Sequence, residues 1–245
     1  MLTSFNDIPA RDRVIVALDC SADQAMRLAD QLAGRAKWLK IGMTLYYACG
    51  PSIIHAMKKL GFNVFLDLKL HDIPHQIRGA AYSAANEGAD MITMHTLGGE
   101  KMLAAGQEGV NAVAEETGRD NTVTLGITVL TSMDDESLNQ VGIERPAADQ
   151  VKLLANVAKG AGISGVVASP QEASMLRELL GPDAYIVTPG VRPKGSDKGD
   201  QSRVATPAEA FAAGASHIVV GRPITQAENP AQAFDVIAKE LDELA

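Results

Sequence analysis

The sequence has little cysteine, few aromatic residues and no long hydrophobic run. Its 245 residues include only two cysteines, Cys20 and Cys49, and 4% aromatic residues. Two cysteines are too few for a disulfide framework and indicate a reducing compartment. No apolar run approaches the ~20 residues needed to cross a bilayer, and residues 1–13 lack the apolar stretch of a signal peptide. We therefore expect a soluble, cytoplasmic protein without a membrane partner.

Positive charge is also scarce. The chain has 22 Lys and Arg residues against 30 Asp and Glu residues, which gives a formal net charge of −8. Such an excess of negative charge argues against nucleic acid or an anionic membrane as a general partner. Any anionic ligand must therefore be bound by a local group of basic residues.

Short apolar runs alternate with alanine-rich helical stretches along the whole chain. The predicted strands are Val14–Asp19, Trp38–Gly42, Val64–Leu68, Met91–His95, Val123–Thr128, Gly165–Ser169, Tyr185–Thr188 and His217–Gly221. Their spacing, roughly 30 residues, is that of a βαβ unit. Most are apolar throughout, which is typical of parallel strands covered on both faces.

Several helix starts are marked in the sequence. The segments Ser169–Glu172 and Thr206–Glu209 each combine a capping hydroxyl, a proline at the first helical position and a glutamate at the third. Ser21 and Asn229 begin weaker versions of the same pattern. These signals support the alternation of strands and helices.

The last helix should follow residue 228, with Ala233, Val236 and Ile237 on one face. No Ser/Gly-rich linker or low-complexity tract divides the chain. Eight strand–helix units favour one closed (β/α)₈ TIM barrel over residues 1–245, with its active site at the C-terminal strand ends. The alternative is an open, doubly wound sheet.

A cluster of charges follows the third predicted strand. Asp67 and Lys69 lie two residues apart, so on a regular strand their side chains share a face, and Asp72 comes where Ile73 and Pro74 should end the strand. Burying charge costs several kcal/mol unless the charge is paired. The cluster therefore indicates either ion pairs that close the end of the barrel or a chemical role.

Polar residues recur at the other predicted strand ends. In chain order they are Asp19, Lys40, Asp67, Lys69, His95, Thr131, Ser169, Thr188 and Arg222. At ~6 Å and an effective dielectric of ~20, one carboxylate stabilises the charged form of Lys69 by roughly 3 kcal/mol. A charged Lys69 is a poor Schiff-base nucleophile but a possible proton donor. Asp67 would repel a substrate carboxylate, which favours its loss as carbon dioxide.

Two loops near the C-terminus carry a second cluster. Pro189–Pro193 contains Arg192, and Gly221–Pro223 contains Arg222. Barrels often bind phosphate with the loops after strands seven and eight, where glycine exposes backbone N–H groups and arginine contacts phosphate oxygens. The polar segment Lys194–Ser202 is long enough to act as a lid, or it is an ordinary loop.

Other patterns are weaker. Gly160–Gly165 has the spacing of a dinucleotide-binding loop but precedes a strand, so we interpret it as a connecting loop. His71–His75 resembles a metal-binding cluster, but Pro74 interrupts it, and no metal site is expected. His55 and His217 should have packing or surface roles, and a hydrogen bond from His95 within the site stays open.

The motifs together resemble the orotidine 5′-monophosphate decarboxylases over nearly the whole chain. They are Leu18–Asp19, Leu39–Gly42, Asp67–Pro74, Thr128–Ser132, Thr188–Arg192, Gln201 and Val220–Pro223. The D-x-K-x-x-D motif is shared with barrels that decarboxylate or condense sugar phosphates. Those relatives carry an acidic residue that serves a magnesium site where this chain has Lys40. The alternative is therefore a magnesium-dependent sugar-phosphate decarboxylase or synthase.

The resemblance implies a cofactor-free conversion of orotidine monophosphate to uridine monophosphate, the last step of pyrimidine synthesis. Lys69 would donate a proton to C6, within a charge network of Lys40, Asp67 and Asp72. Asp19 and Lys40 would bind the ribose. The implied substrate-contacting residues are Asp19, Lys40, Asp67, Lys69, Asp72, Ile73, Thr131, Arg192, Gln201, Gly221 and Arg222. The resemblance also implies a homodimer in which Asp72 reaches the neighbouring site.

Overall fold

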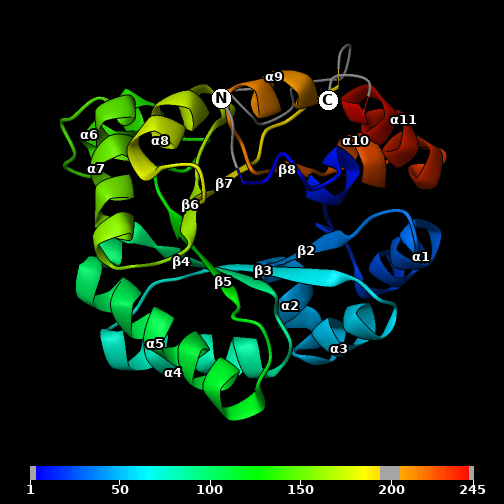
Figure 1. Cartoon of the computed structure of the whole chain (residues 1–245), viewed down its shortest axis with the longest axis horizontal. Coiled ribbons are helices and arrows are strands. Elements are labelled where there is room, and N and C mark those ends of the chain that lie inside the picture. Colours follow the sequence, from blue (N-terminus) through cyan, green and yellow to red (C-terminus); the bar gives the residue numbers. More distant parts are fainter. Residues whose placement is uncertain (1–3, 194–204, 243–245) are drawn as a thin grey trace.

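Eight parallel strands close into a barrel in the computed structural model, which describes residues 4–193 and 205–242 (Figure 1). The strands are β1 (Val14–Ala17), β2 (Trp38–Gly42), β3 (Asn63–Leu70), β4 (Met91–His95), β5 (Val123–Ile127), β6 (Gly165–Val167), β7 (Tyr185–Thr188) and β8 (His217–Val220). Each pairs with its neighbours in sequence, and β1 pairs with β8. The predicted TIM barrel is confirmed, and the open sheet is wrong because the ring has no free edge.

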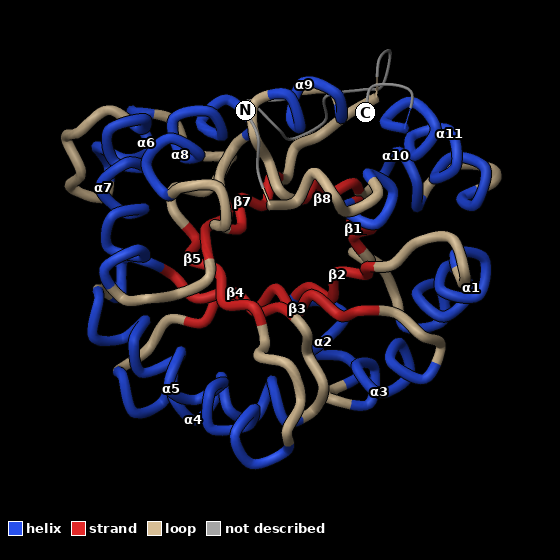
Figure 2. The backbone as a smooth tube through the Cα atoms, viewed as in Figure 1, coloured by secondary structure: helices blue, strands red, loops and turns tan. Residues whose placement is uncertain are grey.

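Helices surround the ring of strands (Figure 2). The α-helices are α1 (Ala22–Leu32), α2 (Met43–Cys49), α3 (Ser52–Lys59), α4 (Pro74–Asn86), α5 (Glu100–Thr117), α6 (Asp135–Gln140), α7 (Ala147–Gly160), α8 (Ala173–Leu180), α9 (Pro207–Ala212), α10 (Arg222–Thr225) and α11 (Pro230–Asp242). Short 3₁₀ turns, η1 (Ala10–Arg13), η2 (Thr96–Gly98) and η3 (Pro170–Glu172), adjoin β1, β4 and α8. None of the helices in the described ranges is long and apolar enough to cross a membrane.

All four predicted helix starts form caps. Ser169 and Thr206 each belong to a capping box, in which the side chain accepts a backbone N–H and a glutamate accepts the backbone N–H of the cap residue. Ser21 accepts the N–H of Gln24, and Asn229 accepts that of Gln232. These bonds satisfy backbone donors that the first helical turn leaves unpaired. The segment Gly160–Gly165 joins the end of α7 to β6, as predicted.

The buried face of α11 differs from the predicted one. Val236 is 60% exposed, whereas Phe234, Ile237, Ala238 and Leu241 are buried. These four positions follow the i, i+3, i+4, i+7 spacing of one helix face, and Val236 lies outside it. Of the predicted set Ala233, Val236 and Ile237, only Ile237 is buried, because the face that packs on the barrel is centred one position further along the helix.

Apolar side chains fill the barrel and leave the polar groups at one end. Inside the ring, residues from seven strands form one buried cluster: Ile15, Ala17, Trp38, Phe65, Met91, Leu125, Val187 and Val219. Larger apolar clusters lie between the strands and the helices. Because the interior is packed, a ligand can enter only at an end of the barrel.

His217 lies in an aromatic cluster at the N-terminal end of β8. Its ring stacks on Tyr185 at 5.5 Å and meets Phe5 and Trp38 edge-on at 5.8 Å each. Burial, and then the charges of Arg13 and Lys37, lower the pKa of His217 from 6.5 to about 3. His217 therefore has the predicted packing role, and the exposed His55 lies at the surface with its Nε2 2.6 Å from Glu87 Oε2.

The His217 environment predicts a pH dependence of stability. The folded state keeps this ring neutral, so its contribution is complete above the unfolded pKa of 6.5 and decreases as the pH falls toward 3. Between pH 7 and pH 5 this group should lower the free energy of unfolding by about 2 kcal/mol. His217→Phe keeps the ring packing but cannot be protonated. Chemical denaturation at both pH values should therefore show that its free energy of unfolding decreases about 2 kcal/mol less than that of wild type between pH 7 and pH 5. Equal losses in the two proteins would contradict the assignment.

Candidate active site

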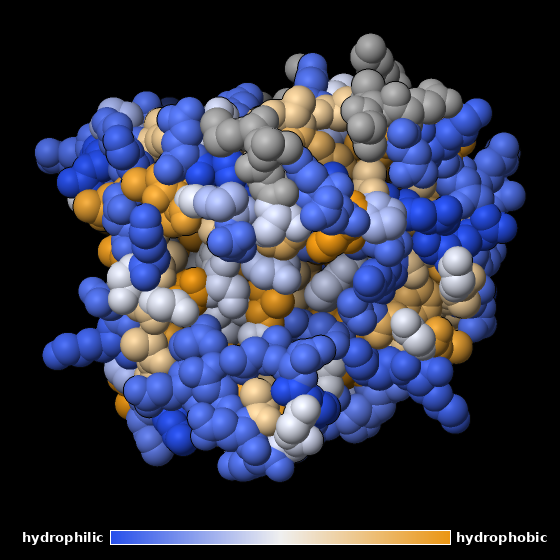
Figure 3. Space-filling view, in the orientation of Figure 1, coloured by the Kyte–Doolittle hydropathy of each residue, from blue (hydrophilic) through white to orange (hydrophobic). Residues whose placement is uncertain are grey.

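A cavity of about 620 Å³ opens at the C-terminal ends of the strands. Side chains and loops from β1, β2, β3, β5, β6, β7 and β8 line it. In Figure 3 hydrophilic side chains dominate the rim of this face, and apolar ones appear at its centre. The volume is within the range of roughly 300–1,000 Å³ usual for small-molecule sites. The predicted location of the site at this end of the barrel thus coincides with a real cavity.

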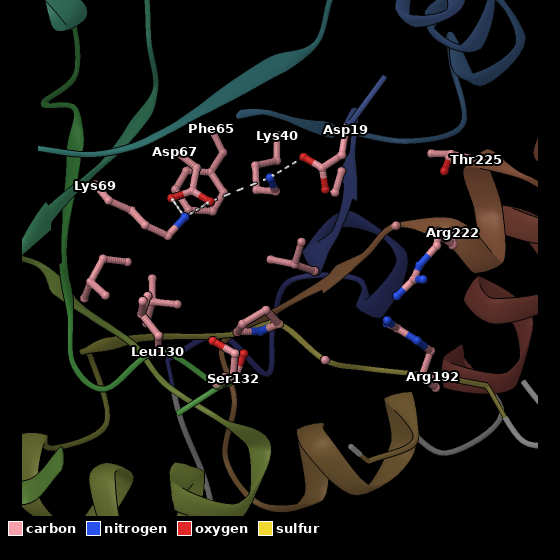
Figure 4. Close-up of a pocket in the computed structure, with 18 of the residues that line it drawn as sticks. Asp19, Lys40, Phe65, Asp67, Lys69, Leu130, Ser132, Arg192, Arg222 and Thr225 are labelled. Carbon is pink, nitrogen blue, oxygen red and sulfur yellow. Dashed lines mark hydrogen bonds and ion pairs between the residues drawn. The ribbon is translucent and has the colours of Figure 1, made fainter. Parts of the chain in front are cut away.

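Four charges of alternating sign form a row along one wall of the cavity (Figure 4). The Lys40 ammonium lies 3.0 Å from Asp19 Oδ1 and 3.6 Å from Asp67 Oδ2. The Lys69 ammonium lies 2.9 Å from both oxygens of Asp67. The sequence-predicted residues Asp19, Lys40, Asp67 and Lys69 are therefore brought together.

Strand register explains how the row forms. Lys40 is level with Ala17 of β1, and Asp67 is level with Gly42 of β2. Asp19 and Asp67 thus lie two residues further along than Lys40, whose long side chain extends toward both. A Cβ atom at Gly42 would lie 3.1 Å from Asp19 Oδ1 and 3.3 Å from Lys40 Nζ. Glycine at this position leaves room for the ion pair.

Burial makes the row more than a surface ion-pair network. The side chains of Lys40 and Asp67 are only 11% and 12% exposed, whereas that of Asp19 is 67% exposed. Burial by itself raises the pKa of Asp67, but the charges of Lys40 and Lys69 and the hydrogen bonds from Lys69 and Thr93 outweigh it. The net effect lowers the pKa of Asp67, which keeps a carboxylate charge inside the cavity.

The backbone of β3 is irregular at Lys69. Lys69 has φ = 52°, in the left-handed region that costs a non-glycine residue roughly 1–2 kcal/mol. The pairing of β3 with β4 shifts between Leu66 and Leu70. The Lys69 backbone N–H donates to Thr93 Oγ1 at 2.8 Å, and that hydroxyl donates to Asp67 at 3.0 Å. Asp67 and Lys69 meet as predicted, but through a bulge and not through simple strand alternation.

Two arginines face each other at the opposite side of the cavity (Figure 4). Arg192 follows β7 and Arg222 begins α10, and both line the cavity together with Gly221. The backbone N–H of Arg192 donates to the backbone oxygen of Ala205 at 2.9 Å, which connects this loop to the segment before α9. Each guanidinium presents N–H donors in a fixed fork that matches the oxygens of a phosphate. Their arrangement suits a phosphate group.

The remaining predicted site residues differ in where they lie. Thr131 lines the cavity beside Leu130 and Ser132. Asp72 is exposed, does not line the cavity, and accepts a hydrogen bond from the N–H of Ile73, which is 62% exposed. The whole predicted lid, Lys194–Ser202, lies outside the described residues, and Gln201 lies within it.

The structure also adds residues that the sequence analysis did not select. Cys20, Gln24, Phe65, Thr225 and Gln226 line the cavity. Cys20 is half-buried, and burial and then the charge of Asp19 raise the pKa of its thiol. Thr93 is completely buried next to the charge row, and a hydroxyl within the apolar run Met91–His95 is the sequence signal that could have identified it.

The histidines near the charge row do not form a metal centre in the described part of the chain. His71 stacks on His95 with ring centroids 5.3 Å apart. Burial, then the nearby His71 and Lys69, lower the pKa of His95, and within the described ranges its Nδ1 has no hydrogen-bond partner. Over those ranges no group of three or more His, Cys, Asp or Glu residues is arranged to hold a metal ion.

Known proteins resemble this chain over nearly its whole length. The family model described as Orotidine 5′-phosphate decarboxylase / HUMPS family matches residues 12–237. Orotidine 5′-phosphate decarboxylases of Moorella thermoacetica and Halorhodospira halophila are each 47% identical to it, over 95% and 96% of this chain and 93% and 98% of their own. The crystal structure of that enzyme from Lactobacillus acidophilus has a TM-score of 0.84 at 38% identity and covers 94% of this chain and 99% of its own.

The geometry predicts unequal roles for the two carboxylates in stability. Asp67→Asn leaves Lys69 without its carboxylate partner and Lys40 with only the exposed Asp19, so it should lower the free energy of unfolding by about 3 kcal/mol. Asp19→Asn is the matched control and should cost less than about 1 kcal/mol, because Asp19 is largely solvated. Chemical denaturation at pH 7 and fixed protein concentration measures both. Equal losses in the two variants would contradict the idea that burial makes Asp67 more important than Asp19 for stability.

Proposed function

The chain belongs to the orotidine 5′-phosphate decarboxylase / HUMPS family, and from this membership we propose the reaction and the residue roles. The reaction is the decarboxylation of orotidine 5′-monophosphate to uridine 5′-monophosphate in pyrimidine biosynthesis, which makes the chain a carboxy-lyase. One observation supports it most strongly. The charge row and the arginine pair stand at opposite sides of a single cavity, and the substrate carries a carboxylate at one end and a phosphate at the other.

The arginine pair orients the substrate. With the phosphate between Arg192 and Arg222, the ribose and the pyrimidine extend toward the charge row. Asp19 and Lys40 bind the ribose hydroxyls, and Thr131 lies near the nucleotide, as in the family's pattern. Gly221 lines the phosphate end, where its backbone lets the phosphate approach closely. Binding groups remote from the reacting carbon supply the energy that holds the carboxylate near another negative charge.

Lys69 and Asp67 carry the chemistry. The bond between C6 and the carboxylate carbon breaks, carbon dioxide leaves, and the electron pair stays on C6. The Lys69 ammonium stabilises this developing carbanion and donates a proton to it, which gives uridine monophosphate and a neutral amine that solvent reprotonates. Asp67, whose pKa is lowered by Lys40 and Lys69 against the effect of burial, stays ionised and repels the substrate carboxylate. Stabilising the carbanion is the larger contribution of the two.

The magnesium-dependent alternative is not favoured by the residues present. The Lys40 ammonium already lies between the carboxylates of Asp19 and Asp67, at 3.0 and 3.6 Å, where a divalent cation would need them. Cations prefer several unneutralised oxygen ligands. Incubation of the purified chain with orotidine monophosphate and a chelator, followed by the loss of ultraviolet absorbance, tests the point. Activity that persists in chelator supports the proposal, and activity that requires magnesium contradicts it.

A homodimer with shared sites and a cytoplasmic location belong to the same proposal. Asp72 and Ile73 come three and four residues after Lys69, yet both are exposed at the surface of the single chain. These residues can therefore reach a site in a second copy of the chain. Two cysteines, both free, are consistent with a reducing compartment.

Separate substitutions should distinguish chemistry from binding. Lys69→Ala removes the proton donor and should lower turnover by about 10³-fold or more, while the affinity for uridine monophosphate stays within a few-fold. Arg222→Ala is the matched control and should weaken that affinity by about 10- to 100-fold through loss of a charge-assisted contact. Steady-state kinetics and calorimetric titration provide the two readouts. Appreciable turnover by Lys69→Ala would contradict its role as proton donor.

Mixing two inactive variants tests the shared site. Lys69→Ala and Asp72→Ala each damage every site of their own homodimer, but a mixed dimer with shared sites contains one intact site. Random exchange of subunits should then restore about a quarter of the wild-type activity. No recovery, when light scattering and subunit exchange show that mixed dimers form, would place Asp72 in the site of its own chain.

A further inference from the structure

We propose that Thr93 is a positioning residue for this reaction, and that its hydroxyl holds both the Asp67 carboxylate and the Lys69 backbone in their working arrangement. The inference rests on the proposed decarboxylase function. Thr93 does not line the cavity, so it acts through the two residues that do.

The hydroxyl of Thr93 joins both halves of the charge pair. It accepts the backbone N–H of Lys69 at 2.8 Å and is 3.0 Å from Asp67 Oδ1. A backbone N–H can only donate and an ionised carboxylate can only accept, so the direction of both bonds is fixed. Thr93 is completely buried, which means that water cannot replace its hydroxyl.

Strand pairing explains why this position matters. Leu66 of β3 pairs with Ile92 of β4, and the next pair is Leu70 with Met94. Three residues of β3, Asp67 to Lys69, therefore lie opposite Thr93 alone. The bulge gives Lys69 its φ of 52°, an unusual conformation for a residue with a side chain.

A change in this bulge would move the reacting groups. The Lys69 ammonium contacts both Asp67 oxygens at 2.9 Å, so the direction of the lysine side chain depends on its backbone and on the rotamer of Asp67. The Thr93 hydroxyl fixes both. Without it, the Lys69 N–H and one Asp67 oxygen lose a buried partner, and the bulge can relax toward a regular strand. Small displacements of reacting groups reduce rates steeply.

Two pairs of variants isolate the hydroxyl. In the first pair, wild type and Thr93→Val, the side chains at position 93 have similar shapes and differ in the hydroxyl. In the second pair, Thr93→Ser and Thr93→Ala, both side chains are smaller and again differ in the hydroxyl. Thr124→Val is the matched control, because Thr124 of β5 is equally buried and its hydroxyl bonds Gln107 and Ser164 outside the site. Each variant is assayed for kcat, for KM and for its thermal midpoint.

The hydroxyl should act on turnover and not on substrate affinity. We expect kcat to fall about 10- to 100-fold in Thr93→Val and Thr93→Ala, with KM changed less than about threefold. Thr93→Ser should keep kcat within about threefold of wild type, and Thr124→Val should leave both constants unchanged. If Thr93→Val does not fold, the comparison of Thr93→Ser with Thr93→Ala decides the question.

Other outcomes overturn the proposal in identifiable ways. A lower thermal midpoint with wild-type kcat in Thr93→Val, or equal kcat in Thr93→Ser and Thr93→Ala, would reduce Thr93 to a packing role. Equal losses of kcat in Thr124→Val would show a general effect of deleting a buried hydroxyl. If wild type itself does not decarboxylate orotidine monophosphate, the proposed function fails, which is a different result from failure of the Thr93 assignment.

Discussion

The burial of Asp67 between two ammonium groups is the interaction on which the site depends. A carboxylate that is only 12% exposed costs several kcal/mol unless opposite charges compensate it. Lys40 and Lys69 provide that compensation from two strands, and their charges lower the pKa of Asp67 against the effect of burial. Asp19, the outermost charge of the row, is largely solvated and so needs less compensation from Lys40 than Asp67 does. Each lysine therefore helps to keep the Asp67 carboxylate ionised inside the cavity.

The barrel fixes where the charged residues of the site lie, and much of this arrangement could be predicted from the sequence pattern. The apolar strands, the helix caps and the D-x-K spacing were sufficient to predict the closed fold and the gathering of charges at one end, since parallel strands in a ring all end on the same face. The arginines after β7 and at the start of α10 follow from the same rule. Predictions of this kind succeed because the C-terminal ends of parallel strands in a closed ring lie on one face, whatever the local side-chain direction.

Features that depend on contacts between elements could not be predicted in this way. The bulge at Lys69 depends on how β3 and β4 pair. The pattern of residues within β3 does not indicate that β3 has two more residues than β4 between successive pairs. Thr93 looks like one more β-branched strand residue until its hydroxyl is placed against Asp67. Asp72 belongs to the strongest motif of the chain, yet it lies outside the cavity, because a residue beyond the strand end follows the loop and not the pleat.

The division of the cavity gives the proposed reaction its physical logic. The phosphate end binds the same group in substrate and product, so its affinity cannot by itself favour the reaction. With the proposed residue roles, the charge row does distinguish them, since the carboxylate that Asp67 would repel is absent from the product and the ammonium of Lys69 would face the carbon that becomes negative. In this proposed mechanism, rate enhancement depends on keeping Asp67 and Lys69 fixed while the negative charge moves from the substrate carboxylate to the carbanion. A buried hydroxyl that bonds the side chain of one and the backbone of the other provides that rigidity at the point where the strand is least regular.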